Sequence, residues 1–79
     1  MSVTTQQIQG IAASQAVRNI LTDLNNSVAT ATTIKASQIS LPEKAALLDV
    51  LNATATRASI EAYPIPLPVK AILLGIAGL

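Results

Sequence analysis

The sequence contains neither cysteine nor histidine. Without cysteine no disulfide can form, and the two absences together remove the commonest zinc ligands. They also remove the usual general bases and the strongest nucleophiles of enzymes. The four carboxylates show no calcium-loop spacing, and the three glycines form no phosphate-binding loop. We therefore expect a protein that is not an enzyme and that holds no cofactor or metal.

Aromatic residues and charges are scarce as well. Tyr63 is the single aromatic residue, and charged residues make up 11% of the chain, against roughly 25% in ordinary soluble domains. Lysine and glutamate are also depleted from the cores of protein interfaces, so this composition is typical of a surface that neighbouring subunits cover. A low charge content is also common in some secreted or viral proteins. That interpretation carries equal weight and is compatible with a surface covered by neighbouring subunits.

The five cations are spread along the chain and form no basic stripe, which argues against specific nucleic-acid binding and against a basic membrane-surface helix. The most apolar segment, 69–79, spans about 16 Å as a helix, whereas a bilayer core is about 30 Å thick. Membrane contact is therefore not favoured. The N-terminus lacks the pattern of a signal peptide. The cations are Arg18, Lys35, Lys44, Arg57 and Lys70.

The 79 residues are enough for one small domain, 1–79, whose thin core makes an isolated monomer marginal. Helical periodicity predicts a first helix over 4–36, because apolar residues from Val17 to Leu24 recur on one stripe. Thr4 and Gln7 have the spacing of a capping box. Ile8 lies off the stripe, so the helix is either apolar on two faces near its start or broken near Gly10. Residues 25–39 are ambiguous between helix and a mixture of strand and turn.

A second helix is predicted over 40–62. Ser40 and Glu43 form a capping box, and Pro42 lies in the first turn, where its missing N–H costs little. The apolar stripe begins with leucines and tapers to alanines, which indicates a close backbone approach near the end of the helix. Arg57 and Glu61 are placed to pair on the exposed side.

Residues 63–68, "YPIPLP", predict an extended strut, since each of three residues precedes a proline and is pushed away from helical geometry. Residues 69–79 then predict a short apolar helix, in which Lys70 falls at the unfavourable end for a cation. The expected fold is all-α: a hairpin of two amphipathic helices, a proline-rich strut and an apolar C-terminal helix that docks onto another chain.

These features favour a non-enzymatic structural subunit of a symmetric assembly, such as a virus or phage particle, a pilus or a needle-like polymer. Its partners are copies of itself or other structural subunits, and its expected place is the virion or another large assembly. One alternative is a small membrane-associated protein that lies at the interface or forms an oligomeric pore. Another is an adaptor that docks a partner protein through its C-terminal segment. The expected interface residues are Tyr63, Ile65, Leu67, Ile72, Leu73, Ile76 and Leu79.

If the tail connects subunits, changing Leu73 and Ile76 to Asp should abolish assembly and leave both earlier helices in place. Sedimentation equilibrium of the full chain, beside a truncation ending at Tyr63, measures this directly. A doubly substituted chain that assembles normally would show that the tail is not the connector.

Overall fold

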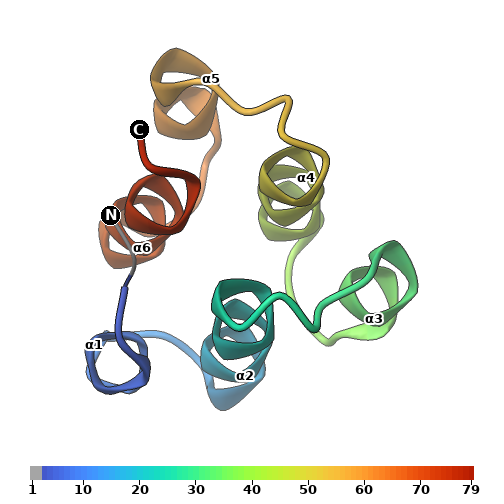
Figure 1. Ribbon diagram of the computed structural model, residues 1–79, viewed down its shortest axis with the longest axis vertical. Helices are drawn as coiled ribbons and strands as arrows, with labels where there is room; N and C mark the ends of the chain where they lie inside the picture. The colour runs from blue at the N-terminus through green and yellow to red at the C-terminus, as the bar shows by residue number, and fades with distance from the viewer. Residues whose placement is uncertain (1–2) are drawn as a thin grey trace.

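The computed structural model describes residues 3–79, and this part of the chain is all-helical, with six helices and no strand (Figure 1). Three of the helices have eleven residues and the others are shorter. The overall extents are 26 × 24 × 22 Å. The helices in chain order are α1 (Thr5–Gln9), α2 (Gln15–Asn25), α3 (Ala31–Ala36), α4 (Leu41–Leu51), α5 (Arg57–Ala62) and α6 (Leu67–Ala77).

The six helices form three successive helical hairpins that repeat in sequence as well as in structure. The N-cap threonines of the short helices recur at intervals of 26 residues, since 30 − 4 and 56 − 30 are both 26. We call the units repeat 1 (4–29), repeat 2 (30–55) and repeat 3 (56–79). This internal repeat was not part of the sequence-based expectation. Residues identical in all three units are Thr4, Thr30 and Thr56; Ile8, Ile34 and Ile60; and Leu21, Leu47 and Leu73.

The repeats are arranged around a common centre. Helices α2, α4 and α6, the second of each hairpin, contact one another pairwise, and each short helix packs on the long helix that follows it. Figure 1 views the three long helices nearly end-on, with α1, α3 and α5 outside them. The first and last repeats are therefore neighbours, as the contact between α2 and α6 requires. The result is a closed arrangement with approximate threefold symmetry.

Local chemistry explains why each unit begins a helix at the same place. The hydroxyl of Thr4 accepts from the N–H of Gln7 at 3.1 Å, and the side chain of Gln7 accepts from the Thr4 N–H at 2.8 Å. The same two-way bonds join the threonine and the residue three positions on in the other repeats. Each box satisfies amide groups that a helix start leaves without partners. The predicted boxes at Thr4 and at Ser40 are confirmed.

The repeat also determines the core. Six of the seven largest fully buried side chains are the isoleucine and the leucine that every repeat carries at the same two positions. Burying a side chain of this size contributes about 1.5–3 kcal/mol. Each isoleucine comes from a short outer helix and each leucine from a long central helix. Their contact in the core therefore joins the outer helices to the central ones. The isoleucines are Ile8, Ile34 and Ile60, and the leucines are Leu21, Leu47 and Leu73.

The helix expected over 4–36 is in fact three helices. The first break follows α1 at Gly10, the alternative that the off-stripe position of Ile8 had left open. The second follows α2, where Ser27 has φ +62°, a left-handed conformation that ends a helix. The ambiguous residues 25–39 thus contain a turn and the short helix α3, with no strand in that range.

The helix expected over 40–62 is likewise divided, into α4 and α5. Ala53, one repeat after Ser27, has φ +58° and ends α4 in the same way. The taper from leucine to alanine therefore marks a helix end and a turn, and not the close approach of one long helix. The expected pair of Arg57 and Glu61 is present at 3.8 Å.

No extended strut runs over 63–68. The connection from α5 to α6 is compact: Ile65 donates its N–H to the Tyr63 carbonyl at 2.8 Å, and Leu67 already begins α6. Pro68 lies in the first turn of α6, where it lacks no required bond. The three prolines thus end one helix and start the next. The apolar C-terminal helix is present, but it packs on this chain's own α2, α4 and α5.

The position of α6 within the fold changes the result expected from substituting Leu73 and Ile76 or truncating the chain at Tyr63. Leu73 is fully buried at the centre of the fold. An aspartate there would place an unpaired charge in the core, and a truncation at Tyr63 would remove one of the three central helices. Both changes are therefore expected to unfold the chain, so neither isolates assembly from folding.

The two left-handed helix ends give a direct test of the repeat geometry. Ser27→Gly and Ala53→Gly should each stabilise the protein by about 0.5–1 kcal/mol, because glycine adopts positive φ without steric cost. Urea denaturation measures the change. The control is Ala71→Gly, at an exposed position within α6, which should destabilise by about 0.5–1 kcal/mol. Destabilisation by all three glycines would contradict the left-handed turns.

Candidate interaction surface

The seven expected interface residues do not form one surface. Leu73 lies in the core with Ile65 and Ile72, so these three side chains already have intramolecular partners. Tyr63 and Ile76 are half-buried against the same core. The two that remain exposed are Leu67 and Leu79, which project from opposite ends of α6.

Repeat symmetry assigns a structural role to three of the five cations. The guanidinium of Arg18 donates to the carbonyl of Gln9 at 3.2 Å. The ammonium groups one and two repeats later, on Lys44 and Lys70, donate to the carbonyls of the equivalent residues at 2.8 and 2.6 Å. In each case a cation from a long helix satisfies a carbonyl in the last turn of the short helix before it, where the helix dipole favours positive charge. Because each repeat carries one such cation at the same position, these three charges are evenly spaced along the chain.

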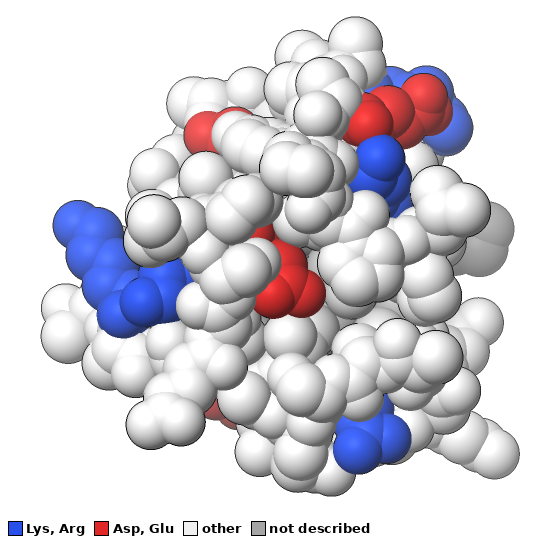
Figure 2. All heavy atoms as spheres, turned by 180° about the vertical axis from the view of Figure 1, so that it is seen from behind, with Lys and Arg blue, Asp and Glu red and all other residues white. Residues whose placement is uncertain are grey.

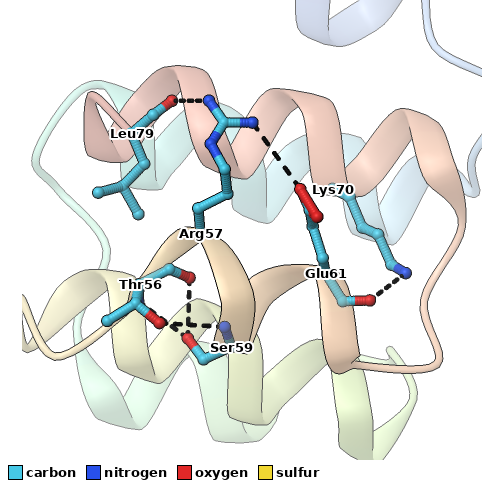
Figure 3. Close-up of polar contacts among 6 residues, drawn as sticks. All are labelled: Thr56, Arg57, Ser59, Glu61, Lys70 and Leu79. Carbon is cyan, nitrogen blue, oxygen red and sulfur yellow. Dashed lines mark hydrogen bonds and ion pairs between the residues drawn. The ribbon is translucent and has the colours of Figure 1, made fainter.

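The close-up in Figure 3 shows why Lys70 is well placed although it lies near the start of α6. Its ammonium group reaches across to α5 and bonds the carbonyl of Glu61. Arg57, on the same short helix, bonds both the Glu61 carboxylate and the carbonyl of Leu79, the latter at 2.9 Å. The ammonium group of Lys70 therefore interacts with the C-terminal end of α5, where a cation is favourable. The expected unfavourable position at the start of α6 considered only the helix that carries Lys70.

Two exposed leucines stand at equivalent positions. Leu41 and Leu67 are the first residues of α4 and α6, and their exposed fractions are 78% and 76%. Repeat 1 has Gln15 at this position. Approximate threefold symmetry places all three at the same end of the central helices. Figure 2, the view from behind, shows a mostly uncharged surface with an acidic group near its centre and basic groups toward its edges. We call Leu41 and Leu67 the leucine pair.

A groove lies between α2 and α3, where repeat 1 meets repeat 2. Its apolar part includes Ala16 and Ile20, and its polar part includes Asp23, Thr33 and Ser37. A second groove lies between α1 and α6, where repeat 3 meets repeat 1, and part of its lining is equivalent to the first: Gln7, Ala71, Ile72 and Gly75. There Gly75 replaces the aspartate, and the side chain of Val3 lies against it: a Cβ at residue 75 would come within 2.5 Å of the valine.

At the third junction, between α4 and α5, the position equivalent to Ser37 of the α2–α3 groove is an aromatic residue, Tyr63. The hydroxyl of Tyr63 donates a hydrogen bond to the carboxylate of Asp49 on α4. This bond raises the pKa of the Tyr63 phenol above its ordinary value, with further contributions from burial and from the negative charge of Asp49. Tyr63 and Asp49 are equivalent to Ser37 and Asp23 of the open α2–α3 groove.

Among residues 3–79 no three potential metal-binding side chains come together. In the same part of the chain, each helix is either too short or too polar to cross a membrane. Comparison with protein families, with curated proteins and with solved structures found no match to this chain. The candidate sites are therefore those that the fold itself presents: the leucine pair and the α2–α3 groove.

Sequence reasoning missed Leu41, Asp23 and Asp49 as members of such sites. The signal that would have found them is the interval of 26 residues, which aligns Asp23 with Asp49 and Leu41 with Leu67. Once the repeats are aligned, the differences at these positions show where one junction or one helix start departs from the others.

The bond between Tyr63 and Asp49 predicts a specific pH dependence. Because the folded-state pKa is raised, the bond contributes fully below the unfolded pKa of about 10 and is lost as the pH rises through the folded pKa. Tyr63→Phe should therefore lower the free energy of unfolding by about 1 kcal/mol near neutral pH. The difference from wild type should shrink above about pH 10. Equal differences at neutral and alkaline pH would contradict this assignment.

Proposed function

We propose that this chain is a non-enzymatic structural subunit that associates with copies of itself through the leucine pair. The observation that carries the proposal is the exposure of Leu41 and Leu67 at equivalent positions of the fold. Two large apolar side chains at one end of a small molecule cost free energy in water that burial by a partner recovers. The composition, with 11% charged residues, supports the same conclusion.

The proposal moves the contact away from the C-terminal arm as a whole. Of the residues first expected to meet a partner, Leu67 is the one on this face that stays exposed, while the buried side of α6 serves the chain's own core. Association through Leu41 and Leu67 leaves all three repeats intact. It also uses surface on both repeat 2 and repeat 3, so the subunit docks as a folded unit.

The repeats themselves supply matched substitutions for the test. Leu41→Gln with Leu67→Gln introduces the residue that repeat 1 already carries as Gln15, so the fold is expected to accept both changes. The control is Val28→Thr, which introduces the residue of the equivalent position, Thr54, at another exposed apolar side chain. Val28 follows the end of α2, away from the leucine pair.

Sedimentation equilibrium of the full chain at about 100 µM should give a multiple of the 8.1 kDa monomer mass. The double glutamine variant should be monomeric with its helix content and thermal midpoint retained, whereas Val28→Thr should assemble like the wild type. A monomeric wild type, or a double variant that assembles normally, would overturn the proposal.

A further inference from the structure

We propose that the α2–α3 groove is a binding site for a tyrosine side chain of a partner protein. The inference goes beyond self-association through the leucine pair, because it concerns a different surface and a different partner. It rests on a comparison within the molecule: the equivalent junction, between α4 and α5, already holds a tyrosine, and that tyrosine donates a hydrogen bond to the equivalent aspartate.

The backbone around the two sites is closely matched. Ser37 ends α3 with φ −71° and ψ 151°, and Tyr63 ends α5 with φ −68° and ψ 138°. The carbonyl of Asp23 accepts from the N–H of Val28 at 2.9 Å, and that of Asp49 accepts from the N–H of Thr54 at 2.9 Å. The two aspartates thus lie at equivalent positions of α2 and α4, and their backbone carbonyls accept equivalent hydrogen bonds.

The groove has the composition that a phenol requires. Ala16, Ile20 and Ala36 provide apolar contact for a ring, and Asp23 belongs to the same lining and offers a carboxylate as an acceptor for the hydroxyl. Its volume is about 380 Å³, within the usual range of small ligand sites. At the α4–α5 junction the residues equivalent to the three apolar ones are also apolar: Pro42, Ala46 and Ala62.

The occupant must come from another protein. Among residues 3–79 the Asp23 carboxylate makes no hydrogen bond or ion pair with a side chain, whereas Asp49 bonds both Tyr63 and the hydroxyl of Thr54. Tyr63 is the only tyrosine of the chain, and its hydroxyl is engaged by Asp49 of repeat 2. A second folded copy therefore offers no free phenol, and a partner of different sequence supplies it.

The probe for the test is N-acetyl-tyrosinamide, titrated into the isotopically labelled full chain and followed by NMR. The expected result is saturable shifts of amide signals around Asn19, Asp23 and Ser37. N-acetyl-phenylalaninamide should bind about fivefold more weakly, since loss of one hydrogen bond to a charged acceptor costs about 1 kcal/mol or more. Asp23→Asn should weaken the tyrosine probe by a similar factor and leave the phenylalanine probe unchanged.

Ser37→Tyr provides a second, independent measurement. It introduces the residue of the equivalent position in repeat 3, so it should fill the groove, raise the thermal midpoint and abolish binding of the probe. Ser37→Phe is the matched control, which should fill the groove and block the probe with a smaller gain in stability.

Three results would overturn the proposal. They are the absence of shifts at millimolar probe, equal affinity for the tyrosine and phenylalanine probes, and tighter binding of N-acetyl-lysinamide, which would mark Asp23 as a simple cation site. None of these depends on the leucine pair, because Leu41 and Leu67 do not line the groove. Failure of this inference is therefore distinguishable from failure of the proposed self-association.

Discussion

Everything in this protein depends on the mutual packing of α2, α4 and α6. A single hairpin of this size has one apolar face and nothing of its own to bury it against, so each repeat needs the other two. Leu21, Leu47 and Leu73 meet this need at the centre, where all three are fully buried. The chain thus solves with internal repetition the problem that other small proteins solve with disulfides or metals.

The places where the repeats differ are as informative as the places where they agree. At one junction Tyr63 bonds Asp49, at another Gly75 makes room for Val3, and at the third the groove stays open beside Asp23. The isoleucine and the leucine that are identical in all three repeats lie at the centre of the core, where the symmetry demands equivalent packing. Both candidate sites lie where the repeats differ, one at a junction and the other at the starts of the long helices.

The few charges are used locally. Three of the five cations satisfy helix-end carbonyls, and Arg57 joins α5 to Leu79, which follows the end of α6 (Figure 3). The surface in Figure 2 is mostly uncharged, with the basic groups toward its edges. With a net charge of +1, the molecule has little of the long-range electrostatic repulsion that keeps many proteins separate, which supports the proposed self-association.

The sequence alone determined the helical class, the capping boxes at Thr4 and Ser40, and the pairing of Arg57 with Glu61, because these depend on neighbours within one turn. It did not reveal where the long apolar segments divide. The left-handed ends at Ser27 and Ala53 use residue types that rarely adopt positive φ, so local preference did not indicate them and packing against the other repeats decides them. Only the tertiary structure decided what α6 packs against. In the sequence its apolar surface is equally compatible with docking onto another chain, whereas the closed arrangement of the three repeats packs it against α2 and α4.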